Sequence, residues 1–301
     1  MNKLVKWVGI AAASAVVIGA GLVAAVTIVA ERKQNRVVQL PGIKAVAFTS
    51  DAAAIERGKY LFASRGCGDC HAPNGAGRVF IDDEKGGMRV RSPNISPGPG
   101  SVVARYTELD WVRAIRHGVK PDGRPLMVMP VEDYNRMTDG DLAALVGYMR
   151  SLPPAQGGAA EFQLPLPVRA VYALGVLKDG PEKVDHSLPP AQPVAEGINR
   201  EHGAYVANLC KGCHNDHLSG GKIPGAPPAW PAAANLTSGE GSGMRGYDSV
   251  DRFKAMLRSG QAPDGRKIAV MPFATLREIN DVDAAAMYEY LKSLPPRPFG
   301  G

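Results

Sequence analysis

The first pattern of hydrophobic and polar positions along the chain is a run of 24 residues without charge, Trp7–Ala30. As a helix rising 1.5 Å per residue it would span about 36 Å, more than the ~30 Å hydrocarbon core of a bilayer. Lys3 and Lys6 precede the run, which favours a cytoplasmic N-terminus. We therefore predict a membrane anchor over residues 1–36. A cleaved signal peptide is the alternative, with Ile28-Val29-Ala30 as a poor cleavage site.

The rest of the chain contains two copies of one helical unit. Residues 111–154 align with residues 253–296 without a gap at an offset of 142, and both contain Pro-Asp-Gly-Arg, Val-Met-Pro and Ser-Leu-Pro-Pro. Near the end of each unit, apolar residues recur at helical spacing behind a capping pattern, Thr138 with Asp141 and Asn280 with Asp283. Duplication is the simplest explanation of so many matches.

Each unit also opens on a predicted helix. The first begins near Ser50-Asp51 and the second near Asn199, and each leads to a pair of cysteines. Gly58 and Gly203 lie inside these helices at a cost of ~1 kcal/mol relative to Ala, which a close helix crossing would explain.

These patterns predict an all-α protein in which two tandem domains follow an N-terminal transmembrane helix. The domains are expected at residues 50–154 and 198–296. Residues 155–197, rich in Pro, Gly and Ala, form a linker between them. Its stretch Val168–Lys178 is apolar enough to pack on one of the domains.

Charge narrows the range of partners. The formal net charge of +6 is spread along the 301 residues, without a block of like charges or a basic patch that contains aromatic residues. Nucleic-acid binding is therefore not expected.

The four cysteines carry the chemistry. They form two C-x-x-C-H motifs, Cys67–His71 and Cys210–His214, one at the start of each unit. Two thiols at this spacing can add to the vinyl groups of one haem, and the following His can bind the iron. A disulfide within each pair would leave the repeated His unexplained, and a zinc site built from the two distant pairs would ignore the repeat. We predict two covalently attached haem c groups, bound by Cys67, Cys70 and His71 and by Cys210, Cys213 and His214.

A sixth iron ligand is expected at Met129 and Met271, which occupy the same place in the two Val-Met-Pro triplets. Met/His ligation raises the reduction potential of a haem. Met127 is the nearest rival, but its counterpart is Ala269. No other His recurs in the repeat, so structural or surface roles are expected for His117, His186, His202 and His217.

Two further repeated pairs have open roles. Arg116 and Arg258 could bind a haem propionate or be solvated. Trp111 and Phe253 could flank the haem or fill the core.

From about residue 50 to 296 the chain resembles the cytochrome c subunits of membrane-bound periplasmic alcohol and gluconate dehydrogenases. The shared features are C-x-x-C-H, Pro-Asn-Ile-Ser or Ala-Asn-Leu-Thr, Asp-Gly-Arg, Val-Met-Pro, the closing Ser-Leu-Pro-Pro, and Leu-Pro-Val-Arg in the linker. The resemblance implies class I cytochrome c folds with the axial pairs His71/Met129 and His214/Met271. Those subunits contain three haem domains, whereas this chain has two motifs and a predicted N-terminal anchor.

The expected function is one-electron transfer, not catalysis. The protein would relay electrons between a membrane or periplasmic redox enzyme and a respiratory acceptor. Its partners would be a dehydrogenase subunit, a quinol-oxidising complex or a terminal oxidase. The haem domains would face the periplasm from the bacterial inner membrane. The alternative is a dihaem cytochrome c peroxidase, which needs one iron with an exchangeable ligand.

Overall fold

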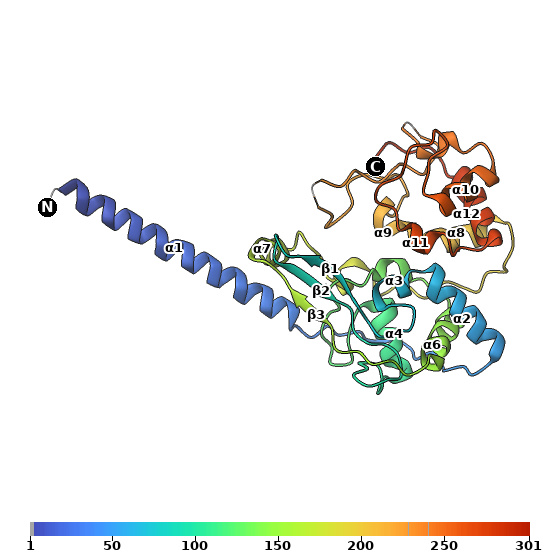
Figure 1. Ribbon diagram of the computed structural model, residues 1–301, viewed down its shortest axis with the longest axis horizontal. Helices are drawn as coiled ribbons and strands as arrows, with labels where there is room; N and C mark the ends of the chain where they lie inside the picture. The colour runs from blue at the N-terminus through green and yellow to red at the C-terminus, as the bar shows by residue number, and fades with distance from the viewer. Residues whose placement is uncertain (1–2, 228, 240) are drawn as a thin grey trace.

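The computed structural model describes residues 3–227, 229–239 and 241–301. A helix of 32 residues, α1 (Lys3–Gln34), projects from a globular part (Figure 1). Within the described residues it is the one helix long and apolar enough to cross a membrane, and its most apolar 18-residue window is not buried. The globular part is mostly helical, as predicted, with a small sheet that was not predicted.

The first unit is built on two packed helices, α2 (Ala52–Ser64) and α6 (Asp139–Ser151). Asp51 caps α2 and Thr138 caps α6, each through a side-chain oxygen that accepts a backbone N–H. The short helix α3 (Cys67–His71), the helix α4 (Glu108–His117) and one turn, α5 (Val131–Tyr134), complete the unit. Leu61, Leu142 and Leu145 lie at the centre of its apolar core.

The second unit repeats this arrangement. The helix α8 (Arg200–Val206) packs on α12 (Asp281–Ser293), with Asn199 and Asn280 as the N-caps. Between them come the 3-10 helix η2 (Ala207–Cys210), then α9 (Lys211–His214), η3 (Gly243–Gly246), α10 (Val250–Ser259) and α11 (Phe273–Leu276).

The two glycines inside α2 and α8 lie at close helix crossings. A Cβ on Gly58 would come 2.0 Å from the carbonyl oxygen of Ala144, and one on Gly203 equally close to that of Ala286. Only glycine allows the two backbones to approach so closely. The crossing that the sequence suggested is therefore confirmed in both units.

The segment between the units contains three short regular elements. Its strand β3 (Glu161–Gln163) joins β1 (Val79–Asp83) and β2 (Met88–Arg91) of the first unit in an antiparallel sheet of the order β1-β2-β3. The helix α7 (Leu166–Ala173) and the 3-10 helix η1 (Gly180–Lys183) follow. The helix α7 packs against the end of α1, and Leu177 of the same apolar stretch lies beside Gly225 of the second unit.

Candidate haem-attachment sites

Each C-x-x-C-H motif forms one helical turn that ends abruptly after the histidine. Ala72 and Asn215 follow the two histidines with φ of 62° and 61°. This left-handed conformation is costly for a residue with a side chain. The next stretch folds back, so that Gly77 N–H donates to His71 O (2.8 Å) and Gly220 N–H donates to His214 O (3.0 Å). The same strained turn therefore presents the cysteines and the histidine in both units.

The two histidines are held in one tautomer. His71 Nδ1 lies 3.0 Å from the carbonyl oxygen of Pro93, and His214 Nδ1 lies 2.8 Å from that of Ala234. A carbonyl oxygen only accepts, so each Nδ1 carries the proton and each Nε2 keeps its lone pair. Burial lowers the pKa of both rings, which keeps them neutral. Each ring is thus prepared to bind a metal through Nε2.

Two asparagines that the sequence analysis did not assign a role support those carbonyl groups. Asn94 Nδ2 donates to the carbonyl oxygens of Pro99 (3.0 Å) and Ala155 (2.8 Å), and Asn235 Nδ2 donates to that of Arg297 (2.9 Å). Both asparagines are fully buried. The repeated Asn-x-Ser/Thr pattern was the signal for this role, because the asparagine oxygen accepts from the backbone two residues on, as in an Asx turn.

The candidate methionines lie at matching places in the backbone. Met129 is partly buried against the core of the first unit and Met271 against that of the second. The prolines that follow have almost the same conformation, φ −79° and ψ 71° at Pro130 and φ −78° and ψ 69° at Pro272. Both units therefore offer a thioether from an equivalent segment, and its ligation to iron stays a prediction.

The residues present fit a covalently bound haem. In each motif two free thiols stand on one turn beside an imidazole with a free Nε2. Cys67 and Cys210 pack against the apolar cores of their units, and burial raises the pKa of both thiols to about 12. Such surroundings suit a porphyrin, whose attachment would use the thiols and whose iron would supply one-electron chemistry.

The other repeated residues have structural roles. Arg116 is buried and pairs with Asp139 (2.7 Å) and with the carbonyl oxygen of Met137 (2.6 Å). Arg258, which is more exposed, pairs with Asp281 and the carbonyl oxygen of Arg277 in the same way. Trp111 and Phe253 are core residues.

The four unmatched histidines differ. His117 and His186 approach each other through their Nδ1 atoms (3.0 Å), and His202 is buried at the contact between the domains. The backbone N–H of His217 donates to the side chain of Asn215.

The two attachment motifs lie on the same contact between the domains. The segment after each Met-Pro reaches the motif of the other unit: Gly212 N–H donates to the Asp133 carboxylate (3.1 Å), and the Thr275 hydroxyl donates to the Asp69 carboxylate. Asp133 in α5 and Thr275 in α11 occupy equivalent positions, 142 apart. Each candidate methionine segment therefore also contacts the partner unit.

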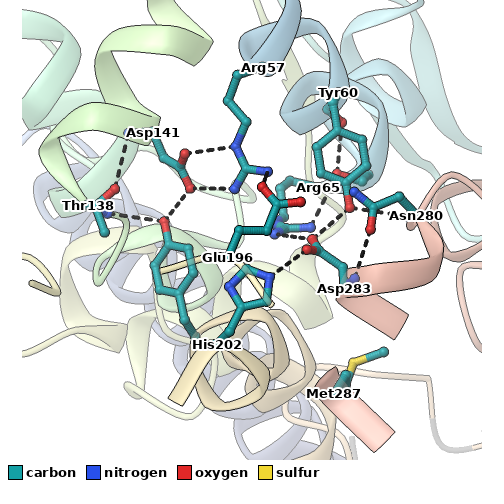
Figure 2. A network of polar contacts seen from close by, with 12 residues as sticks. Arg57, Tyr60, Arg65, Thr138, Asp141, Glu196, His202, Asn280, Asp283 and Met287 are labelled. Carbon is teal, nitrogen blue, oxygen red and sulfur yellow. Dashed lines mark hydrogen bonds and ion pairs between the residues drawn. The ribbon is translucent and has the colours of Figure 1, made fainter. Parts of the chain in front are cut away.

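A reciprocal set of polar contacts joins the domains beside these motifs (Figure 2). Tyr60 of α2 donates to Asp283 of α12 (2.6 Å), and Tyr205 of α8 donates to Asp141 of α6 (2.7 Å). Within its own unit, Asp141 accepts from Arg57 (3.0 Å) and Asp283 accepts from His202 (2.8 Å). These two carboxylates are thus shared between the units.

Each tyrosine oxygen also accepts a backbone N–H from a helix N-cap of the other unit. Thr138 donates to Tyr205 (3.2 Å) and Asn280 donates to Tyr60 (3.3 Å). Arg65 adds an ion pair to Asp283 (3.4 Å), and both side chains are buried.

The chain has two equivalent sites, each with a cysteine pair, a neutral histidine and a distant methionine. This arrangement is typical of proteins that attach two haems covalently for electron transfer. The model of the cytochrome c family matches residues 55–153 and 202–295. The chain therefore belongs to the cytochrome c family. It carries two covalently bound haem c groups, one for each matched region.

Several known proteins are similar to this chain. The chain is 29% identical to the fructose dehydrogenase cytochrome subunit of Gluconobacter japonicus, over 82% of this chain and 54% of that protein. It is 28% identical to the gluconate 2-dehydrogenase cytochrome c subunit of Pantoea cypripedii, over 80% and 60% of the two chains. A diheme cytochrome c-type protein of Cereibacter sphaeroides is 26% identical, over 79% and 85%. The chain thus spans a little over half the length of these two dehydrogenase subunits.

Proposed function

We propose that this chain relays electrons one at a time through two haems with the axial ligand pairs His71/Met129 and His214/Met271. The observation that carries this proposal is the equivalence of the two sites: the same histidine tautomer and the same backbone after the methionine occur in both. A peroxidase would need one iron that differs from the other. The relatives are named as cytochrome subunits, which also favours electron transfer.

The contact between the domains supports transfer from one haem to the other. Each attachment motif touches the segment that follows the candidate methionine of the other unit. Because these contacts are direct hydrogen bonds, both haem sites border the same interface. Electrons would then enter at one haem and leave at the other without a change in domain arrangement.

The partner on the donor side is proposed to be a dehydrogenase, as the names of the relatives suggest. A quinol-oxidising complex is the other candidate donor, and the acceptor would be a terminal oxidase. With α1 in the bacterial inner membrane and Lys3 and Lys6 on its cytoplasmic side, the haem domains would lie in the periplasm.

A redox titration of the purified chain tests this proposal, with covalent haem counted by mass. We expect two low-spin centres, and Met129→Ala and Met271→Ala should each lower the potential of one centre while haem stays attached. Met127→Ala is the matched control and should leave both potentials unchanged. If neither alanine variant at 129 or 271 moved a potential, the proposed ligands would be wrong.

A further inference from the structure

An apolar surface is exposed beside the end of α1. It consists of α7 and the turn after it, Leu174–Val176, where Leu174 is 77% exposed and Val176 is 74% exposed. Gly175 between them has φ of +76°, which lets the chain turn so that both side chains stand out. Leu166 and Val171 of α7 are also exposed. A soluble domain would not gain from exposing this much apolar area at one place.

This surface contacts α1 at a defined position along the helix axis. The face of α1 that α7 covers begins at Val26 and continues one and two turns later through Ala30 and Lys33. The 20 residues from Trp7 to Val26 span about 30 Å, which already matches the hydrocarbon core. If α1 crosses the membrane, α7 therefore meets it where it leaves the hydrocarbon and enters the headgroup layer. Figure 1 shows α7 at the edge of the globular part from which α1 projects.

Buried polar contacts make α1 and this segment one rigid unit. Lys33 Nζ donates to the carbonyl oxygen of Tyr172 (3.1 Å), and Arg36 Nη2 donates to Asp179 Oδ1 (2.8 Å). Tyr172 donates from its hydroxyl to the same carboxylate (2.7 Å), and both of these side chains are fully buried. Arg36 is thus bound to a carboxylate that lies out of water, where such a pair is difficult to break.

We propose that α7 and the turn Leu174–Val176 rest in the interfacial layer of the lipid bilayer and fix the orientation of the haem domains on the membrane. This inference rests on the proposed insertion of α1. The end of the apolar helix α1 packs against α7, and two exposed basic residues, Arg32 near that end and Lys178 two residues after Val176, can attract anionic headgroups. The whole arrangement has two membrane contacts, one spanning and one lying flat.

Photo-crosslinking of the full chain in phosphatidylethanolamine–phosphatidylglycerol vesicles tests the inference. Leu174, Val17 and Ile198 are replaced in turn by p-benzoyl-phenylalanine. Val17 lies in α1 and reports insertion, while Ile198, 64% exposed and next to α8, is the matched exposed control. We expect lipid adducts at 17 and at 174, with a yield at 198 at least tenfold below that at 174.

The outcomes separate the two proposals. Adducts at 17 without adducts at 174 would leave the anchor in place and overturn the interfacial contact. No adduct at 17 would overturn the insertion of α1 and this inference with it. A protein adduct at 174 would assign the apolar surface to a second copy of the chain and also overturn the lipid contact.

A second measurement reads orientation directly. Linear dichroism of the haem absorption in oriented bilayers should be strong for the unaltered chain and should fall at least twofold in the double variant Leu174→Ser/Val176→Ser. Ile198→Ser should leave it unchanged. Equal dichroism in the double variant and the unaltered chain would show that α1 alone sets the orientation, against the proposal.

Discussion

The two tyrosine hydroxyls between the domains lead to a quantitative prediction about docking. Tyr60→Phe removes one donor from Asp283, and Tyr205→Phe removes one donor from Asp141. Each carboxylate keeps other donors, because Arg65 and His202 still bind Asp283 and Arg57 still binds Asp141. The loss per site is therefore at the lower end for a hydrogen bond to a charged group, about 1.5 kcal/mol.

The backbone N–H groups of Thr138 and Asn280 add to this loss, because each donates to a tyrosine oxygen that the substitution removes. With a further ~0.5 kcal/mol for each weakened N–H, we expect about 2 kcal/mol per variant. The two sites meet only at Arg57, which binds Asp141 and lies 5.4 Å from the centre of the Tyr60 ring. Because phenylalanine keeps that ring, the double variant should lose about 4 kcal/mol. Burial raises the pKa of both phenols to about 12, so they are donors at any physiological pH.

The assay is guanidinium unfolding of the haem-loaded full chain, followed by haem absorption. Tyr148→Phe is the matched control: its ring packs edge-on against Phe62, and its hydroxyl makes no hydrogen bond within residues 3–227, 229–239 and 241–301. The control should unfold within about 0.5 kcal/mol of the unaltered chain. If the double variant behaved like the control, the contacts would not stabilise docking and the reasoning would fail.

Three further predictions concern attachment, packing and pH. Cys213→Ala should impair covalent haem attachment in the second domain alone, measured by mass of the two halves after proteolysis; two thioether bonds retained there would refute the assignment. Gly203→Ala should lower the free energy of unfolding by about 3 kcal/mol because its Cβ would meet the carbonyl oxygen of Ala286. The control Gly140→Ala, where nothing lies within 4 Å, should be neutral or stabilising. Equal unfolding midpoints for the two variants would contradict this prediction. Burial alone would raise the pKa of Asp283, but Arg65, Tyr60 and His202 together lower it, so its contribution to stability is present above the unfolded pKa of about 3.9 and is lost as pH falls through the folded value. The free energy of unfolding should therefore fall between pH 5 and pH 3, and it should fall less in Asp283→Asn. Equal falls in the two proteins would count against this reasoning.

Local signals predicted the helices and the attachment motifs. Thr138 and Asn280 cap the predicted helices because a capping pattern acts over three residues. The glycines at 58 and 203 were compatible with a close crossing or with a local irregularity, and the structure shows the crossing. The C-x-x-C-H turns are equally local. These features depend on neighbours along the chain, which is why the sequence reveals them.

Contacts between distant segments were not predictable in the same way. Tyr60 and Asp283 are 223 residues apart, and neither residue type indicates such a partner. The strand β2, Met-Arg-Val-Arg, is short and half charged, and besides its local partner β1 it pairs with β3 in the linker, where Arg91 lies opposite Glu161. The apolar stretch that forms α7 was predicted to pack on another part of the protein. The surface on which it packs could not be predicted, because it depends on the contact between Tyr172 and Asp179.

The reciprocal contacts between the domains have the form of an isologous dimer interface. Tyr60 and Tyr205 lie at equivalent positions, as do Asp141 and Asp283, so an approximate two-fold axis relates the halves. In such an interface the same patch occurs on both sides and is buried when the two halves associate. A single domain of this kind would carry a self-complementary face, and joining two copies in one chain closes the pair internally. The fused protein therefore has no second copy of that patch left for assembly, and its remaining surface is free for redox partners.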